Sequence, residues 1–339
     1  MKYKLGELTK IRTGKLDANA SSENGKYPFF TCSKETLRIS TYSYDCECVL
    51  VAGNGDLNIK YYNGKFEAYQ RTYIIEDNGS QKLYIPYLYF FMERYVDELR
   101  NQSIGGVVKY IKLSNLTDAL IELPNFEIQK QVVKILRKVS EIIKLKHTQI
   151  NKLDKLIKAR FVEMFGDPIR NTQCRPTTKF INVVKMQRGF DLPVQDRQQD
   201  GAVSVYGSNG VLGYHNNAKI KGGGIITGRS GTIGKVFYTE DDYWPLNTSL
   251  FSVDTYGNNV IYLAYLLQMY DLTRFVEGTG VPTLNRNMFH NKPIIDVSKE
   301  EQNIFAAFVH QTDKSKLAVQ KALDETKLLF DSLMQQYFG

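Results

Sequence analysis

One segment, Gly228-Arg-Ser-Gly-Thr-Ile-Gly-Lys235, resembles a phosphate-binding loop at first sight. A phosphate-binding loop needs four residues between its outer glycines and a Ser or Thr after the lysine, whereas here five residues intervene and Val236 follows. The next residues, Val-Phe-Tyr-Thr, favour a strand, but a phosphate-binding loop opens a helix whose N-terminus faces the phosphate. The segment therefore predicts a Gly-rich hairpin rather than a site of nucleotide hydrolysis.

Other catalytic signatures are missing from the sequence. It has no GxGxxG fingerprint, no GxSxG elbow and no HExxH pair. None of the nine prolines is followed by Pro or Asp, which excludes the signature of amino-methyltransferases and the usual nuclease core. The four histidines are scattered, and the four cysteines lack the spacing of a zinc site and suit a reducing compartment. We therefore expect no catalytic site, no metal and no bound cofactor.

Basic, amide and aromatic side chains gather among glycines in both halves of the chain. Arg and Asn can make bidentate hydrogen bonds to guanine and adenine, while Lys and backbone amides on Gly-rich turns grip phosphates. Each such residue alone is more typical of a solvated loop, and glycines such as Gly53 and Gly228 are more typical of turns. Their clustering in both halves predicts DNA-binding sites at Asn54, Lys60, Tyr61, Lys65 and Arg71, and at Arg188, Tyr206, Asn209, Arg229, Lys235, Asn285 and Arg286.

The positive charge is concentrated in one segment. The formal net charge is +8, and Glu127 to Phe165 holds ten Lys and Arg against four Asp and Glu. Such a segment is either a solvated helix face or a basic strut that faces a polyanion or an acidic partner. The sequence has no apolar leader at its start and no run of eighteen apolar residues, so we expect a cytoplasmic protein that is neither secreted nor in a membrane.

The chain repeats itself after about 175 residues. At an offset of 175, Gly14 aligns with Gly189, Ser33 with Ser208, Gly53 with Gly228 and Tyr87 with Tyr262; at 173 or 174, Gly106 aligns with Gly280, Gln129 with Gln302, Phe165 with Phe338 and Gly166 with Gly339. This period is too long for a solenoid and indicates duplication of a whole domain with its connecting element.

Two apolar stripes predict two long helices. In the first copy the stripe breaks near His147, and in the second Thr312 and Ser315 replace apolar positions. Helices of nearly forty residues need a partner, so we expect the two to pair as an antiparallel coiled coil. The interface residues predicted from the stripes are Ile128, Val132, Ile135, Val139, Ile142, Leu153 and Ile157, and Phe305, Phe308, Leu323, Phe330 and Met334.

Ahead of each helix, short β-rich runs alternate with Gly, Asn and Asp turns, at 27–32, 48–52 and 69–75 in the first copy and at 203–206, 224–227, 235–238 and 249–253 in the second. One helix follows in each copy, from Tyr84 to Leu99 and from Asn259 to Phe275. The predicted fold is mixed α/β (α+β), with recognition domains at 1–123 and 167–298, long helices at 124–166 and 299–339, and a pseudo-two-fold axis between the copies. About 35 helical residues at ~1.5 Å each would separate the domains by roughly 50 Å, or on the order of 10–15 base pairs of B-DNA.

These features together resemble the specificity subunit of type I restriction-modification systems. The resemblance covers essentially the whole chain and rests on the duplicated layout, the Gly-Thr-Ile-Gly-Lys-Val hairpin and the Gly278 to Asn285 segment. It also rests on the Pro and Gln that open the first long helix in LPNFEIQKQVV, on the Pro-less counterpart DVSKEEQNIF, and on the closing Phe-Gly pair. The first copy departs from the pattern, with Ile104-Gly-Gly-Val-Val-Lys-Tyr-Ile111 in place of Gly278 to Asn285.

The resemblance implies a noncatalytic reader of double-stranded DNA with a split target. It implies docking on two modification subunits that carry S-adenosylmethionine and methylate adenine, and indirect contact with restriction subunits that use ATP and Mg²⁺. Two other classes stay open from the residues alone. A stand-alone DNA-binding regulator would not need such long basic helices, and a coiled-coil scaffold would not need two diverged Gly-rich domains.

Overall fold

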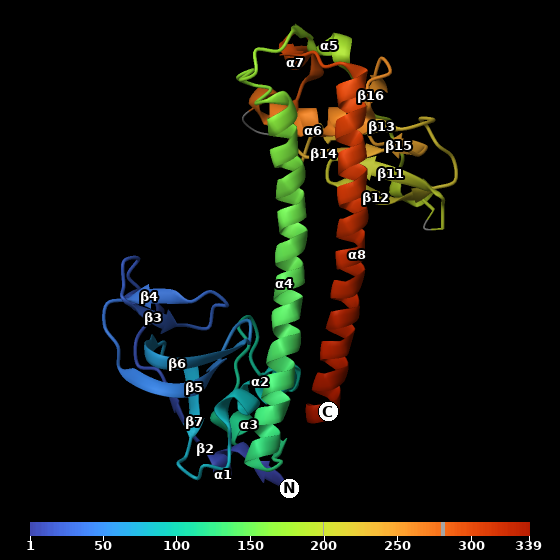
Figure 1. Ribbon diagram of the computed structural model, residues 1–339. Coiled ribbons are helices and arrows are strands. Elements are labelled where there is room, and N and C mark those ends of the chain that lie inside the picture. The colour runs from blue at the N-terminus through green and yellow to red at the C-terminus, as the bar shows by residue number, and fades with distance from the viewer. Residues whose placement is uncertain (199, 279–281) are drawn as a thin grey trace. The chain divides into compact units, whose positions relative to one another are not determined.

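The computed structural model describes residues 1–198, 200–278 and 282–339, and it divides into two compact units. The first unit comprises Met1–His147 with Ala322–Gly339, and the second comprises Thr148–Lys321. Helices α4 (Phe126–Phe165) and α8 (Lys299–Phe338) each contribute one end to each unit (Figure 1). Within the described residues, no helix is both long and apolar enough to cross a membrane.

The first unit is built on a six-stranded sheet with the order β2-β7-β5-β6-β3-β4. Its strands are β2 (Thr9–Thr13), β3 (Tyr27–Phe30), β4 (Leu37–Ile39), β5 (Tyr44–Ala52), β6 (Ile59–Ala68) and β7 (Thr72–Asp77). A small pair, β1 (Lys2–Lys4) and β8 (Leu120–Glu122), lies beside α1 (Leu5–Leu8), α2 (Ile85–Gln102) and α3 (Leu113–Thr117), and a short 3-10 helix spans Ala18–Ala20.

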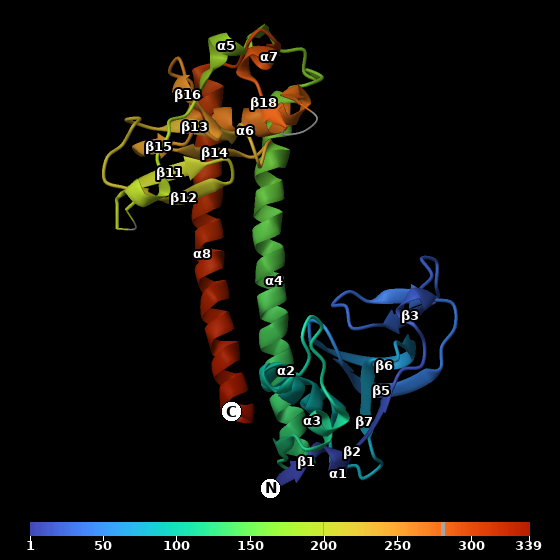
Figure 2. The same ribbon diagram turned by 180° about the vertical axis from the view of Figure 1, so that it is seen from behind.

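Helix α2 forms the middle layer of the first unit. Leu88 and Met92 of α2 share one hydrophobic core with Val49 of β5 and with Val132 and Leu136 of α4. In Figures 1 and 2, α2 lies between the sheet and the first half of α4. The sheet, α2 and the long helices therefore bury their apolar sides against one another in three layers.

The second unit repeats this plan with smaller sheets. One sheet has the order β10-β16-β13-β14 and another β12-β11-β15. The elements are β9 (Thr177–Lys179), α5 (Phe180–Val183), β10 (Lys185–Arg188), β11 (Val203–Gly207), β12 (Gly210–His215), β13 (Gly224–Gly228), β14 (Val236–Thr239), β15 (Tyr243–Pro245), β16 (Ser249–Asp254), α6 (Val260–Tyr270), β17 (Val276–Glu277), β18 (Thr283–Leu284), α7 (Arg286–His290) and β19 (Pro293–Ile295), with 3-10 helices at Val194–Asp196 and Leu272–Phe275.

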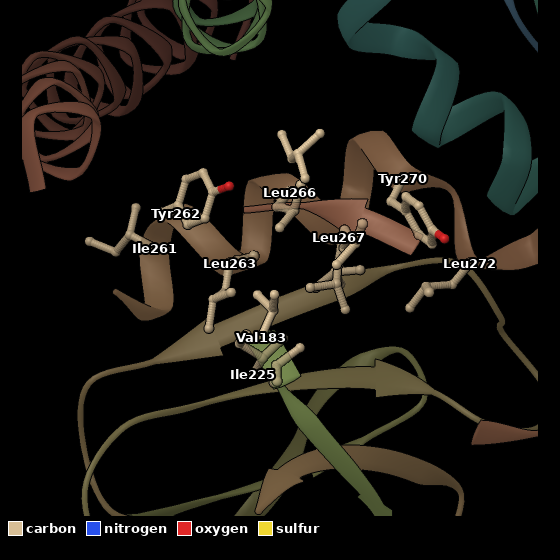
Figure 3. Packing of buried hydrophobic residues seen from close by; sticks show 14 of the residues in the cluster. Val183, Ile225, Ile261, Tyr262, Leu263, Leu266, Leu267, Tyr270 and Leu272 are labelled. Atoms are coloured by element: carbon tan, nitrogen blue, oxygen red, sulfur yellow. The ribbon is translucent and has the colours of Figure 1, made fainter. Parts of the chain in front are cut away.

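Helix α6 is apolar on all sides, as expected of a helix covered by a sheet on one side and by other helices on the other. Leu263 points toward Ile225 of β13, whereas Tyr262 lies on the opposite side of the helix (Figure 3). The Tyr262 ring packs on Phe165 at the end of α4, with ring centroids 5.1 Å apart.

The two ends of the long helices pair in antiparallel fashion within the second unit. The Asp154 carboxylate of α4 pairs with the Lys316 ammonium of α8 at 2.5 Å, and the Phe161 ring meets the Phe305 ring at 5.5 Å. Residue numbers therefore rise along one helix as they fall along the other, which confirms the predicted direction there. The hydroxyl of buried Thr312 donates a hydrogen bond to the Phe308 carbonyl (2.9 Å). The polar residue is therefore tolerated in the seam.

Not every residue predicted for the helix seam is buried. Val132, Val139, Ile157, Phe305, Leu323 and Met334 are buried, and Leu153, Phe308 and Phe330 are partly buried. Ile128, Ile135 and Ile142 are instead 43%, 41% and 44% exposed, so they lie outside the core of the first unit. The part of α4 that enters the core of the first unit instead includes Val133 and Leu136, which the sequence stripe did not single out. A place for the three isoleucines at a partner interface stays a prediction.

The long helices and the predicted β-rich runs lie where the sequence pattern predicts, but several strands are missing from the prediction, and β6 is the longest of them. Its sequence, Ile-Lys-Tyr-Tyr-Asn-Gly-Lys-Phe-Glu-Ala, is too polar to stand out as a buried strand, and only its first residue and its last three are buried. In the second copy the expected helix from Asn259 to Phe275 ends at Tyr270, because Asp271 adopts a left-handed conformation with φ of 55°.

A buried glutamine ties each long helix to the domain that precedes it. Gln129 accepts a hydrogen bond from the Tyr84 amide (2.8 Å) at the start of α2 and donates to the carbonyls of Lys82 and Pro124. Gln302 repeats the arrangement and accepts from the Asn259 amide (2.9 Å) at the start of α6. The aligned glutamines of the two copies therefore have the same structural role.

Replacing Gln302 by Met should destabilise the second unit. The Asn259 amide and the Val297 carbonyl would lose their buried partner, and unpaired buried groups cost ~1–3 kcal/mol each, so we expect a loss of about 2–4 kcal/mol. The free energy of unfolding from a denaturant titration measures it. Gln311→Met on the exposed side of α8 is the control and should change stability little; equal losses in the two variants would contradict the role of the Gln302 bonds.

Candidate nucleic-acid interface

A polar pocket opens beside the Gly-rich hairpin of the second unit. Its volume is about 370 Å³. Four residues predicted from the sequence line it together, drawn from three separate parts of the chain: Arg188, Arg229, Asn285 and Arg286. Leu250, Glu277, Thr283, Leu284 and Asn287 complete the lining.

The framework fixes each arginine at the pocket. Arg188 is the last residue of β10 and pairs with Leu250 of β16. Arg229 follows β13, where its amide donates to the Thr248 carbonyl (2.9 Å) and its carbonyl accepts from the Leu284 amide (2.8 Å). Arg286 is the first residue of α7. Strand pairing, backbone hydrogen bonds or a helix start fixes the backbone of each arginine. The three guanidinium groups can therefore line the same pocket.

The Gly-rich segment after β13 forms a hairpin, as predicted from the sequence. Residues 229–235 connect β13 to β14, so a strand and not a helix follows the glycines. A Cβ at Gly228 would lie 1.8 Å from the Thr232 carbonyl oxygen, which shows that the tight turn requires glycine there. Of the predicted Gly278 to Asn285 segment, residues 279–281 lie outside the described residues.

The first unit has a smaller pocket, of about 100 Å³, at the equivalent place. Thr13 of β2 pairs with Tyr73 of β7 in the same way as Arg188 pairs with Leu250. The short bridge between Ile104 and Tyr110 likewise corresponds to the pairing of Glu277 with Thr283. The pocket is lined by Thr13, Gly53, Gln70, Arg71, Tyr73, Tyr110 and Ile111.

The hydrogen bonds correct the sequence alignment of the two hairpins. Gly53 donates to the Arg71 carbonyl (2.9 Å) and accepts from the Ile111 amide (3.0 Å), the same pair of bonds that Arg229 makes. Gly53 therefore corresponds to Arg229 and not to Gly228, and the offset is 176 rather than 175. The sequence alignment of Gly53 with Gly228 was wrong here, because Gly228 is required by the tight turn whereas Gly53 lies at the position of Arg229.

The pocket of the second unit carries charge that the protein leaves uncompensated. Among the described residues, no ion pair joins Glu277 to Arg188, Arg229 or Arg286. The Glu277 carboxylate lies 3.5 Å from the Asn285 amide nitrogen. Glu277 is not predicted from the sequence, because the prediction rests on basic, amide and aromatic residues. Its place at the pocket comes from the pairing of Glu277 with Thr283, which is visible only in the structure.

Four predicted residues of the second copy make contacts inside the protein. The Asn285 side-chain oxygen caps α7 by accepting from the Asn287 amide (3.0 Å). Lys235 donates to Asn209 (2.7 Å), and both side chains are exposed. Tyr206 is partly buried and packs edge-on against Tyr243 with centroids 6.0 Å apart. Lys235 and Asn209 lie at the surface as predicted, whereas Tyr206 has a packing role.

In the first copy the predicted residues are divided between the pocket and strand β6. Arg71 lines the pocket, and Asn54 bridges to Tyr110 at its edge. Lys60 donates to the Ser33 carbonyl (2.6 Å), and burial lowers its pKa. Lys65 is exposed and lies over the Tyr42 ring at 4.8 Å.

Tyr61 of β6 faces the long helix α4. It donates to the Glu47 carboxylate (2.6 Å), and Arg137 of α4 lies 5.6 Å from its ring centroid. Burial, followed by the bond to Glu47, raises the pKa of Tyr61 to about 12. Tyr61 is therefore held within the first unit.

A buried histidine connects α7, which carries Arg286, to β10, which carries Arg188. His290 at the end of α7 accepts a hydrogen bond from the Met186 amide through Nε2 (3.2 Å), which requires the neutral ring. Burial, together with the nearby charges of Arg286 and Lys185, lowers the pKa of His290.

Comparisons with known proteins agree with this geometry. The family described as Type I restriction modification DNA specificity domain matches residues 1–155 and 179–326. The specificity subunit of the type I restriction enzyme EcoDI of Escherichia coli is 42% identical over 121 residues, which span 36% of this chain and only 27% of that subunit.

Two further relatives match along most of their length. The putative type I specificity subunit S.MpnORF507P of Mycoplasma pneumoniae is 20% identical over 322 residues, or 88% of this chain and 86% of that protein. The crystal structure of the S subunit of a type I restriction-modification system from M. genitalium shares the fold, with a TM-score of 0.70 at 16% identity, covering 100% of this chain and 96% of that one.

The depressed pKa of His290 predicts a pH-dependent stability. Above the ordinary histidine pKa of ~6.5 the ring is neutral in both states; below it the unfolded chain takes up a proton that the folded protein resists, so stability falls with pH down to the lowered pKa. Denaturant titrations between pH 8 and pH 5 should show this slope. His290→Gln should flatten it, the exposed control His147→Gln should retain it, and an unchanged slope in His290→Gln would refute the assignment.

Proposed function

Because the chain belongs to the type I restriction-modification DNA specificity family, we propose that it selects the DNA sequence on which a type I complex acts, by reading a bipartite and asymmetric target. The observation that carries this proposal is the pocket that occurs twice at the same framework position with different linings. Arg188 and Arg229 in the second unit correspond to Thr13 and Gly53 in the first. Two readers of different chemistry on one framework suit two different half-sites.

The proposed role needs partners, because the chain is proposed to read DNA and not to modify it. Two modification subunits would bring S-adenosylmethionine and methylate adenine, and restriction subunits, reached through them, would bring ATP and Mg²⁺. Ile128, Ile135 and Ile142 are spaced every seventh residue on α4 and are each more than 40% exposed. An exposed apolar stripe of this kind on a long helix supports docking of a protein partner there.

The two half-sites should be separable by domain exchange. Replacing residues 1–122 with the first domain of another family member should change one half-site of the methylated sequence and leave the other intact, because each unit carries its own pocket. Methylome sequencing of a host that carries the chain with its modification subunits gives both half-sites. A palindromic target, or a change in both half-sites, would contradict the proposal.

Arg229 should contribute to sequence-specific affinity, unlike the lysines of α4. Arg229→Ala should weaken cognate binding by ~1–3 kcal/mol if the guanidinium makes a bidentate base contact. Lys152→Ala and Lys155→Ala, both on exposed positions of the helix, should flatten the salt dependence of binding without changing sequence preference.

Binding of the assembled complex to cognate and scrambled duplexes at several salt concentrations measures both effects. The division of roles would be wrong if Arg229→Ala bound the cognate duplex as well as the wild type does. It would also be wrong if the helix lysines altered discrimination between the duplexes.

A further inference from the structure

We infer that the pocket of the second unit reads a single G·C base pair, with its arginines on guanine and Glu277 as the residue that selects cytosine. This inference rests on the proposed function and assigns a base pair to one of its two half-sites. The pocket combines three cationic donors, Arg188, Arg229 and Arg286, with one carboxylate acceptor.

The carboxylate distinguishes a base-reading pocket from a phosphate clamp. Three arginines alone suit a phosphate or a guanine edge equally well. A carboxylate at the same place would repel phosphate oxygens, but it accepts a hydrogen bond from the cytosine amino group. Since Glu277 is not neutralised by an ion pair with these arginines in the described part of the chain, it stays available as an acceptor.

The geometry holds the donors and the acceptor on different elements of one rigid framework. Arg229 leaves β13 between two backbone hydrogen bonds, and Glu277 lies on β17, paired with Thr283. The floor of the pocket is apolar, because Leu250 and Leu284 are buried beneath it. Arginine and glutamate therefore come from separate elements of the framework, so one can bind guanine while the other binds the cytosine of the same pair.

The first unit has uncharged residues at the positions that correspond to three of these four charged residues. Thr13, Gly53 and Ile104 stand in place of Arg188, Arg229 and Glu277. A Cβ at Gly53 would lie 2.4 Å from the Arg71 carbonyl oxygen, so the first pocket has no room for the second pocket's arginine. The first unit must therefore read its half-site by other chemistry, centred on Arg71 and Gln70.

The test is the methylated sequence produced by Glu277→Gln and Glu277→Ala in the complex with the modification subunits. Domain exchange first identifies which half-site belongs to the second unit. We expect that half-site to contain a G·C pair in the wild type, and we expect both variants to relax it by about 5- to 150-fold relative to the other base pairs. The first half-site should not change. Asp241→Asn, which removes one exposed carboxylate outside the pocket, is the matched control and should leave both half-sites as they are.

The outcomes separate this inference from the proposed function. If the wild-type complex methylates a bipartite target but the second half-site lacks a G·C pair, or if both variants keep it unchanged, the inference falls and the proposed function stands. Tighter binding of Glu277→Gln to all duplexes with an unchanged target would identify a phosphate clamp instead and overturn the inference. If the wild-type complex binds and methylates no specific sequence, the proposed function itself fails.

Discussion

The structure depends on one buried hydrogen-bonded side chain in each unit, the glutamine at the start of a long helix. Gln129 and Gln302 each bind the first free amide of the preceding domain helix and the carbonyl of the turn that leads into their own helix. The first amides of a helix have no hydrogen-bond partner within the helix. The side-chain oxygens of these two buried glutamines accept hydrogen bonds from such amides at a place that water does not reach. The domain is thereby fixed against the helix on which it sits.

At the opposite end of each long helix, aromatic packing joins hydrogen bonds that Arg175 donates to the Met164 carbonyl and Arg94 donates to the Gln335 side chain. Phe165 packs on Tyr262 in the second unit, and Phe338 packs on Tyr87 in the first, with ring centroids 5.1 Å and 4.9 Å apart. Each unit therefore receives a glutamine from one long helix and a phenylalanine from the other. Neither unit has a complete core without both helices, which is the physical reason why the duplication includes a whole domain and its helix.

The framework was predictable from the sequence because it repeats strong patterns. The long helices, the α2 and α6 layers and the aligned anchors Gln129 and Gln302 all follow from apolar periodicity or from the repeat. Strand β6 was not predictable, since its polar residues bond within the domain through contacts distant in sequence, such as Lys60 with the Ser33 carbonyl. The pocket was predictable only in part: residue type suggested Arg188, Arg229 and Arg286, but Glu277 enters through strand pairing.

The correspondence of Gly53 with Arg229 explains how one framework can hold two pockets of different chemistry. Gly228 is fixed by the tight turn, so it says nothing about recognition. The next position has the same backbone bonds in both copies but different room for a side chain, because a Cβ at Gly53 would lie 2.4 Å from the Arg71 carbonyl oxygen. The first copy has Gly53 there and the second Arg229. Because the bonds at this position come from the backbone, its side chain can change between copies without loss of the sheet. Recognition can therefore diverge at such positions while the fold stays constant, and a pocket of 100 Å³ in one copy becomes a charged pocket of 370 Å³ in the other.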